Sequence, residues 1–287
     1  MGAISNPGIR LLQGGFVLLR DLVHERTGLY FDDTKADTFL DKLSPLIGEK
    51  TMGPFLDYFH FLKYDSNSAG EWRKICDELT VQESYFWREM EQIHALVDEI
   101  VPQYFKAHPG EPLNIWSAAC AAGCEPITIA MALNEAGWFE REKINIFASD
   151  ASPRAIEAAQ TGIYRENAFR RLPGALREKY FFPPSAAAGA KRLSHASREI
   201  QSRVQWRITN LMSGADLELA PMTSPVIFCR NMFIYFSQHA ARKTVRAFAE
   251  TMPRPAYLFI GMAESLMDVR SDFELREIGG AFVHIRN

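Results

Sequence analysis

The chain has 287 residues, of which 47% are hydrophobic, and a formal net charge of −3. This length and composition predict an ordinary soluble protein with two domains, or one large α/β domain that carries an appendage. The slightly acidic balance excludes a global attraction to nucleic acid or to an anionic membrane. Recognition of a charged partner must therefore depend on local clusters.

The apolar segment at residues 9–23 is interrupted by Arg10, Arg20 and Asp21. It is predicted to be neither a membrane-spanning helix nor a signal peptide, so we expect no direct membrane insertion. The cysteines are Cys76, Cys120, Cys124 and Cys229. They are too scattered for a disulfide scaffold and lack the partners that zinc spacing requires. We therefore expect a reducing, cytoplasmic environment and no metal.

Up to about residue 106 the sequence predicts helices, because apolar residues recur at spacings of three and four. The predicted helices are Phe16 to His24, Lys35 to Leu46, Phe55 to Leu62, Glu71 to Leu79 and Met90 to Phe105. Strand signals are almost absent from this part. Residues 1–106 are therefore predicted to form an N-terminal helical domain.

Residues 107–287 alternate between strand and helix patterns, which predicts an α/β domain with a mostly parallel sheet. The predicted strands are Leu113 to Ser117, Ile144 to Ala148, Pro225 to Phe228 and Tyr257 to Ile260. The predicted helices are Pro126 to Ala136, Pro153 to Thr161 and Gln238 to Glu250. Phe273 to Ile278 and Ala281 to Ile285 flank two glycines and predict an antiparallel C-terminal hairpin.

A long insert, at about residues 175–208, separates the second and third predicted strands. Its middle, Pro183 to Ala190, is rich in Pro, Ala and Gly and is predicted to be mobile. The flanks, Arg192 to Ser197 and Ile200 to Ile208, fit a small hairpin, an extension of the main sheet or a solvated loop.

The segment Ser117 to Gly123 joins the first strand to the next helix and contains no residue larger than Cys. A ligand can approach such a main chain closely, near the carboxyl end of a strand. The segment lacks both GxGxxG and GxxxxGK[ST], which indicates a nucleotide without phosphates. Asp150 follows the second strand, where a carboxylate can accept hydrogen bonds from ribose hydroxyls. The alternative is that Asp150 merely begins the following helix.

Two further clusters are LTVQESYFWR at residues 79–88 and IFCRNMFIYF at residues 227–236. Together with SAACAAGCEP, FASDASPRAIEAAQTGIY and LFIGMAES, they resemble the chemotaxis receptor methyltransferase (CheR) family along essentially the whole chain. The resemblance implies a helical domain followed by a Rossmann-like methyltransferase domain with a small β insert. It also implies methyl transfer from S-adenosylmethionine to glutamate side chains of a chemoreceptor's cytoplasmic signalling domain, which forms methyl esters.

The resemblance also implies a set of cofactor-binding residues. These are Gln82, Ser84, Arg88, Glu125, Asp150, Asn210, Leu211, Arg230 and Asn231. Arg88 and Tyr235 are implied to be catalytic, because they can orient the incoming carboxylate. Without the family pattern, Arg230 fits a surface ion pair, Asn231 an ordinary turn and Tyr235 a core aromatic.

The chain departs from the family pattern at several positions. Gln82 and Ser84 stand where relatives commonly have Asn and Thr, and both keep a polar group. Cys124 replaces a second Glu, and Met262-Ala263 replaces His-Ser. The segment Lys35 to Lys50 has as many acids as bases, although the matching helix of well-studied relatives is basic. This weakens the electrostatic case for an acidic receptor helix.

Two functional questions stay open at this level. The insert lacks the glycine-bearing hairpin of relatives that tether themselves to a receptor's C-terminal peptide, so we expect action without a tether. The alternative functions are a regulatory module that binds S-adenosylmethionine and a divergent methyltransferase with another protein substrate. An NAD-dependent oxidoreductase is disfavoured by the missing glycines, and a nucleic-acid enzyme by the missing basic stripe.

Overall fold

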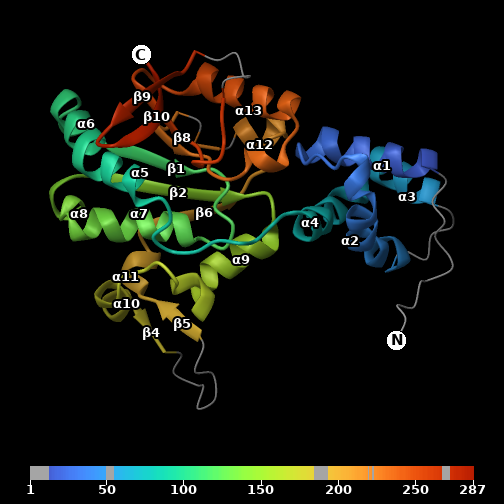
Figure 1. The fold of residues 1–287 in the computed structure, drawn as a ribbon, viewed down its shortest axis with the longest axis horizontal. Helices are drawn as coiled ribbons and strands as arrows, with labels where there is room; N and C mark the ends of the chain where they lie inside the picture. The colour runs from blue at the N-terminus through green and yellow to red at the C-terminus, as the bar shows by residue number, and fades with distance from the viewer. Residues whose placement is uncertain (1–12, 50–54, 184–192, 219, 222, 267–271) are drawn as a thin grey trace.

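The computed structural model describes residues 13–49, 55–183, 193–218, 220–221, 223–266 and 272–287. Figure 1 shows a group of helices from the N-terminal part of the chain beside a sheet that is flanked by helices. This arrangement confirms the predicted fold class, a helical domain followed by an α/β domain with a small β insert.

Four helices build the N-terminal domain: α1 (Gln13–Thr27), α2 (Ala36–Glu49), α3 (Phe55–Tyr64) and α4 (Ala69–Leu79). The 3-10 turns η1 (Asp33–Lys35) and η2 (Ser66–Ser68) lead into α2 and α4, and the aspartate before each turn caps a backbone N–H. The apolar faces of the four helices meet in one core. Its fully buried side chains include Leu19, Phe39, Leu43, Tyr58 and Ile75.

The α/β domain is built on a seven-stranded sheet with the order β6-β2-β1-β7-β8-β10-β9. The strands are β1 (Leu113–Ser117), β2 (Ile144–Asp150), β6 (Val204–Ile208), β7 (Val226–Phe228), β8 (Ala256–Phe259), β9 (Glu274–Ile278) and β10 (Ala281–Arg286). The first five strands of this order are parallel, whereas β10 and β9 form the predicted antiparallel hairpin. Residue 117 lies opposite residues 148 and 228, so three strands end at one edge.

Helices cover both faces of the sheet, so its central strands are buried on both sides. On one face α7 (Cys124–Glu135) packs in the same core as Leu113 and Ile115 of β1. On the other face α13 (Gln238–Thr251) contributes Val245 and Phe248, which pack in a core with Trp116. The remaining connections hold α8 (Trp138–Arg141), α9 (Pro153–Thr161), η5 (Phe233–Tyr235) and the short α12 (Gly214–Glu218).

The predicted domain boundary at residue 106 differs from the boundary in the structure. The segments α5 (Met90–His94), η3 (Ala95–Ile100) and α6 (Val101–Ala107) follow one another directly. Their buried residues, including Ile93 and Leu96, belong to the core of the sheet and α7. The helical domain therefore ends near residue 80, because helical periodicity does not indicate which core a helix joins.

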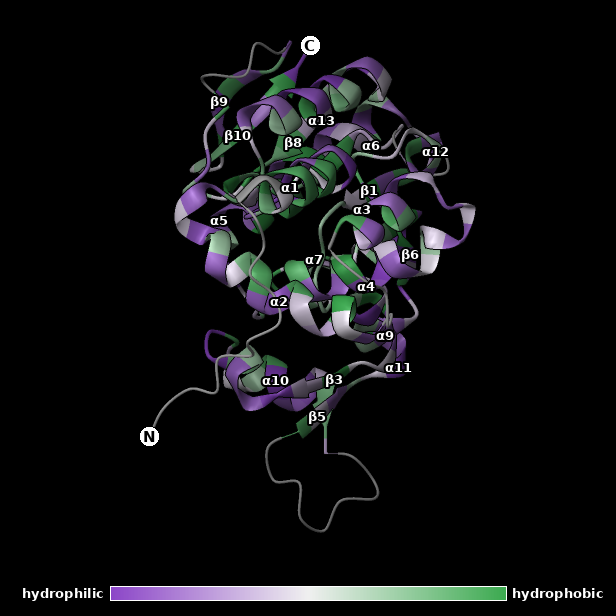
Figure 2. Cartoon of the chain, turned by 90° about the vertical axis from the view of Figure 1, so that its right-hand side faces the viewer, coloured by the Kyte–Doolittle hydropathy of each residue, from purple (hydrophilic) through white to green (hydrophobic). Residues whose placement is uncertain are grey.

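The insert forms a separate antiparallel sheet with the order β3-β5-β4, made of β3 (Ile163–Arg165), β4 (Phe181–Phe182) and β5 (Leu193–Ala196). The short elements η4 (Glu166–Phe169), α10 (Gly174–Tyr180) and α11 (Arg198–Gln201) complete it. It begins at residue 163 rather than 175, and β6, predicted within it, extends the main sheet beside β2. Residues 184–190 of the predicted mobile segment lie outside the described residues. Figure 1 and Figure 2 both place this subdomain at the opposite end of the molecule from β9 and β10.

The helical domain is attached to the α/β domain through the segment after α1. Leu29 forms an isolated antiparallel bridge with Phe236, and the Tyr30 N–H donates to the Tyr235 carbonyl at 2.9 Å. His24 Nε2 lies 2.7 Å from the Ser237 hydroxyl. At a second contact, Asp77 of α4 accepts the Arg154 N–H of α9 at 3.0 Å. Both contacts flank the carboxyl edge of the sheet.

In the described part of the chain, no helix combines the length and the apolar character that a bilayer crossing requires.

Candidate active site

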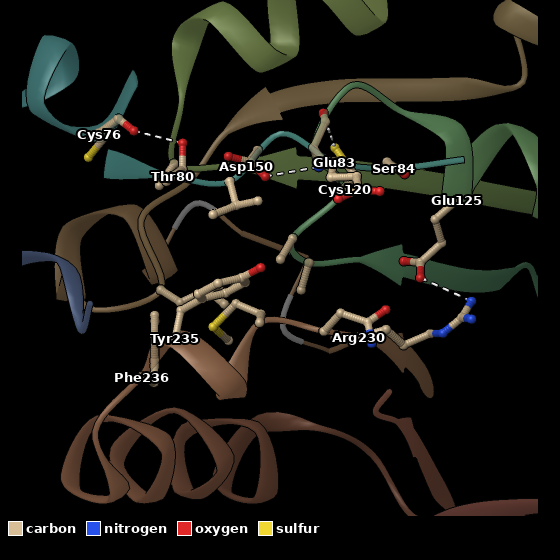
Figure 3. Close-up of a pocket in the computed structure, with 18 of the residues that line it drawn as sticks. Cys76, Thr80, Glu83, Ser84, Cys120, Glu125, Asp150, Arg230, Tyr235 and Phe236 are labelled. Carbon is tan, nitrogen blue, oxygen red and sulfur yellow. Dashed lines mark hydrogen bonds and ion pairs between the residues drawn. The ribbon is translucent and has the colours of Figure 1, made fainter. Parts of the chain in front are cut away.

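A cavity lies at the carboxyl ends of β1, β2 and β7, between the sheet and the helical domain (Figure 3). It encloses about 1060 Å³, including its open mouth. Nine of the ten predicted site residues line it: Ser84, Arg88, Glu125, Asp150, Asn210, Leu211, Arg230, Asn231 and Tyr235. Residues distant in sequence thus meet in one cavity at the edge where open α/β sheets bind ligands.

The predicted small-residue loop lines one wall of the cavity, through Ala118 to Ala121. Its backbone is tied to the strand ends, since Ala118 donates to the Phe228 carbonyl at 2.7 Å and Cys120 to the Ser149 carbonyl at 2.9 Å. Gly123 has a φ of +88°, and a Cβ there would lie 2.7 Å from the Trp206 ring. The glycine is therefore required by packing behind the loop.

Asp150 ends β2 with its side chain at the cavity, and the residue is only 9% exposed. One carboxylate oxygen accepts the Ala121 N–H and the other the Ser152 N–H, both at 2.9 Å. Burial raises the pKa of Asp150, and these two N–H groups oppose the rise. The N-cap of α9 is Ser152, whose hydroxyl accepts the Ala155 N–H, so Asp150 does more than begin that helix.

Arg230 is the centre of a buried charge cluster beside the loop (Figure 3). Its side chain is 3% exposed, and its Nη1 lies 3.2 Å from Glu125 Oε2 and its Nη2 3.0 Å from Glu89 Oε2. Glu125 also accepts the Ser117 hydroxyl at 2.7 Å, and burial raises the pKa of Glu125. The surface ion pair considered for Arg230 is therefore wrong, because the Arg230 side chain is buried and its two partners are only 13% and 14% exposed.

Tyr235 occupies the other side of the cavity, at the end of η5. Its ring points into the cavity in Figure 3, and the residue is 37% exposed. The core aromatic considered for this position is therefore wrong. The Arg88 guanidinium is also partly exposed, at 32%, and lies 5.3 Å from the Tyr85 ring centroid. Both side chains are therefore accessible to solvent.

Asn210 and Leu211 form the floor between β6 and α12. The Asn210 amide donates to the Arg26 carbonyl of α1 at 2.8 Å, and its oxygen accepts the Met212 N–H at 3.0 Å. Leu211 is 6% exposed and packs in the core beneath. Asn210 therefore links the floor of the cavity to the helical domain.

Gln82 is the one predicted site residue that does not line the cavity. Its amide nitrogen donates to the Thr80 hydroxyl at 2.8 Å, and its buried amide oxygen has no hydrogen-bond partner among the described residues. Because the side chain folds back onto Thr80, the segment before Ser84 presents other groups to the cavity.

Cys124 lies behind the loop and does not line the cavity. Its thiol is 1% exposed and contacts the Ser84 hydroxyl. Burial raises the pKa of Cys124 to about 12, so the thiol stays protonated at neutral pH. The replacement of the family's second Glu by Cys124 therefore changes the packing behind the loop and not the lining of the cavity.

Several residues of the site carry no recognisable signal in the sequence. Thr27 of α1, Leu29 after α1 and Cys76 of α4 line the cavity, although this part of the chain carries only a core-forming pattern. Glu89 carries no such signal either, although it follows Arg88 directly. Tertiary contacts bring these residues in, so no local motif identifies them.

Backbone strain concentrates around the cavity. Among the described residues, the non-glycine positions with positive φ are Trp87, Glu89, Ala121 and Asn231. Ala121 and Asn231 line the cavity, Glu89 holds Arg230, and the Trp87 N–H donates to Thr128, a lining residue. Such conformations persist only where the surroundings fix them, and they cluster at functional sites.

The described residues include no group of three or more His, Cys, Asp or Glu side chains that could hold a metal ion. Of the cavity's carboxylates, Asp150 accepts two backbone N–H groups, Glu125 pairs with Arg230 and Glu83 pairs with Arg170. The arrangement suits an organic ligand with hydroxyl and amino groups.

Comparison with known proteins assigns both domains. The family model of the CheR methyltransferase SAM binding domain matches residues 82–281, and that of the CheR methyltransferase all-alpha domain matches residues 14–80. These limits agree with a boundary near residue 80.

Curated relatives match over nearly the whole chain. The chain is 34% identical to chemotaxis protein methyltransferase 2 of Vibrio cholerae, over 91% of this chain and 88% of that protein. It is 28% identical to the chemotaxis protein methyltransferase of Escherichia coli, over 93% of this chain and 90% of that protein.

Among solved structures, magnesium protoporphyrin IX methyltransferase from Synechocystis, with bound SAM, matches with a TM-score of 0.35 and 14% identity, over 79% of this chain and 94% of that chain. The family models and the curated relatives carry the assignment. The chain belongs to the CheR methyltransferase family and is an S-adenosylmethionine-dependent methyltransferase of the chemotaxis type.

Proposed function

We propose that this protein transfers the methyl group of S-adenosylmethionine to glutamate carboxylates in the cytoplasmic signalling domain of a chemoreceptor, and that it acts in the cytoplasm. The observation that carries the proposal is one cavity with a buried carboxylate, Asp150, on one side and an accessible tyrosine, Tyr235, on the other. The relatives named chemotaxis protein methyltransferases supply the substrate class.

The residues of the cavity fit S-adenosylmethionine. Asp150 uses two N–H partners, which leaves carboxylate lone pairs free for ribose hydroxyls. The loop at Ala118 to Ala121 allows close approach to the main chain, and Leu211 offers an apolar floor. Arg88, Ser84, Asn210 and Asn231 are proposed to bind the remaining polar groups of the cofactor.

Arg230, which the resemblance implies to be a cofactor-binding residue, is proposed to act on the cofactor indirectly. Its guanidinium already binds Glu89, Glu125 and the Arg88 carbonyl. We propose that it fixes the position of Glu125, which can then accept a hydrogen bond from the cofactor's amino group. Arg88, which is partly exposed, is the better partner for an incoming carboxylate.

S-adenosylmethionine, when bound, supplies an activated methyl group that a carboxylate oxygen can take by in-line displacement. The protein needs no nucleophile of its own, so its task is positioning, which contributes up to about 7–11 kcal/mol in well-oriented reactions. Tyr235 is proposed to donate its hydroxyl to the acceptor and to align it. Arg88 is proposed to hold the acceptor ionised while leaving it nucleophilic.

The experiment is incubation of the full chain with labelled S-adenosylmethionine and a chemoreceptor signalling domain. Glutamate methyl esters should release the label as methanol under mild base. Label that survives base treatment would contradict ester formation. If the receptor domain takes up no label while another protein takes up base-labile label, the result would favour the alternative function, a divergent methyltransferase with another protein substrate.

One observation favours that second candidate. Helix α2 carries three acids, Asp37, Asp41 and Glu49, against one base, Lys42. Such a surface offers no electrostatic steering toward an acidic receptor helix. Methylation rates for acidic and charge-neutral acceptor segments should therefore differ little, and their salt dependence should be weak.

We also propose that the protein acts without a receptor tether. The three-stranded insert sheet is present, but the sequence at residues 183–190 lacks the glycine-bearing hairpin of tethering relatives. A pull-down with receptor C-terminal peptides should recover no complex. Binding that depends on residues 193–208 would contradict this part of the proposal.

A further inference from the structure

The segment Gly261–Ser265 after β8 is part of LFIGMAES, one of the five sequence motifs that resemble the CheR family. None of its residues lines the active-site cavity. The other four motifs each contribute lining residues. The position of Glu264 explains why this segment matters.

Glu264 joins two chain segments that end neighbouring parallel strands. Its Oε2 accepts the Gly261 N–H at 2.7 Å and the Asn231 N–H at 2.8 Å. Its Oε1 accepts the Ile234 N–H at 3.2 Å. One carboxylate therefore holds both ends of the turn that lies between Arg230 and Tyr235.

This turn must be stabilised by contacts from outside its own residues. Asn231 has a φ of +57°, a left-handed conformation that costs free energy for a residue with a side chain. The turn is also packed tightly against the β8 segment, since a Cβ at Gly261 would lie 2.2 Å from Asn231 Nδ2. Hydrogen bonds from N–H groups to an ionised carboxylate are strong enough to hold such a turn.

We propose that Glu264 is a positioning residue for methyl transfer, which fixes the turn Asn231–Ile234 and thereby sets the place of Tyr235 at the mouth of the cavity. The inference rests on the proposed function, because it assigns Tyr235 to the acceptor side. Glu264 itself does not line the active-site cavity.

The variant Glu264→Gln tests this inference with little change in volume. The amide oxygen can still accept the Gly261 and Asn231 N–H groups, but the amide NH₂ then faces the Ile234 N–H, donor against donor. We expect kcat to fall about tenfold while the dissociation constant of S-adenosylmethionine changes by less than about twofold. Hydrogen exchange of the Ile234 amide should become faster, and exchange in the strands should stay unchanged.

Glu250→Gln is the matched control, because this exposed carboxylate of α13 pairs with Arg246 on the same helix. It should leave kcat and exchange at Ile234 unchanged. Glu264→Asp keeps the charge on a shorter stem and should recover more kcat than Glu264→Gln, provided that it restores slow exchange at Ile234.

Two outcomes would overturn the inference. The first is a wild-type kcat in Glu264→Gln although exchange at Ile234 is faster. The second is a rise in the dissociation constant of S-adenosylmethionine that equals the fall in kcat, which would make Glu264 a residue for cofactor binding. Failure of the proposed function looks different, since the wild-type protein would then put no base-labile label on the receptor domain.

Discussion

The two sides of the cavity hold their functional groups by different means. On the β2 side, Asp150 is held by the backbone N–H groups of Ala121 and Ser152, which neither titrate nor rotate. On the β7 side, Arg230 is held by the side chains of Glu89 and Glu125, while Tyr235 stays partly exposed. The difference fits the proposed roles, in which Asp150 binds the cofactor's ribose, whereas the second side aligns the acceptor through Tyr235 and also binds the cofactor's amino group through Glu125.

The largest effect is expected from breaking the charge cluster of the β7 side. Arg230→Met leaves Glu89 and Glu125, which are only 13% and 14% exposed, without their counter-charge, which should lower the free energy of unfolding by about 3 kcal/mol. Urea denaturation measures this loss. A loss below about 1 kcal/mol would mean that the two carboxylates do not depend on Arg230.

A backbone change should act mainly on the β2 side. In Gly123→Ala the added methyl meets the Trp206 ring at 2.7 Å, and the residue must keep a φ of +88°. The loop must shift, so we expect about tenfold weaker binding of S-adenosylmethionine by calorimetry. Gly70→Ala is the control, since its methyl meets nothing within 4 Å in α4, and it should leave binding unchanged. Equal affinities in both variants would contradict a binding role for the loop.

A smaller effect is expected from pH. Burial raises the pKa of Asp150, so protonation sets in at a higher pH than for an ordinary aspartate. The protonated group loses its charge, and affinity for S-adenosylmethionine should weaken as the pH falls through the raised pKa. The effect of Asp150 on the free energy of unfolding has the opposite sign. A pKa that is raised in the folded state stabilises the fold at low pH, and this contribution is lost as the pH rises through the raised pKa.

The control for this pH dependence is Asp150→Asn, which cannot ionise. Its affinity, measured by calorimetry at each pH, should be weaker than that of the wild type at neutral pH and should change less on acidification. A parallel decline in both proteins would assign the pH dependence to another group.

The smallest effect is expected at Cys124, which lies behind the loop on the β2 side. Cys124→Ala removes a neutral, buried thiol that does not line the cavity. We expect a loss of about 1 kcal/mol in stability and a change below about twofold in cofactor affinity. A tenfold change in affinity would show that the departure from the family acid alters the site itself.

Local patterns predicted the elements that build the β2 side. The predicted ranges Leu113 to Ser117 and Pro153 to Thr161 equal the bounds of β1 and α9. A largely buried strand and the Ser152-Pro153 helix start are strong local signals. Asp150 follows from the same signals, because it ends a strand next to the small-residue loop.

Contacts distant in sequence could not be predicted in this way. Glu89 meets Arg230 across 141 positions, and Glu264 meets Asn231 across 33. The insert sheet could not be predicted for a similar reason. Strands β3 and β4 are three and two residues long, and both pair with β5, which follows later in the chain. Such short strands carry no periodicity, so their pairing is a property of the folded domain.

The central claim is that cofactor binding and methyl transfer depend on opposite sides of one cavity. The most direct measurement compares Asp150→Ala with Tyr235→Phe, using the dissociation constant of S-adenosylmethionine and the single-turnover rate of methyl transfer at saturating cofactor. Asp150→Ala should weaken binding at least about tenfold with a rate within about threefold of wild type. Tyr235→Phe should slow transfer at least about tenfold with nearly unchanged binding, and the reverse pattern, or equal losses in both quantities, would contradict the account.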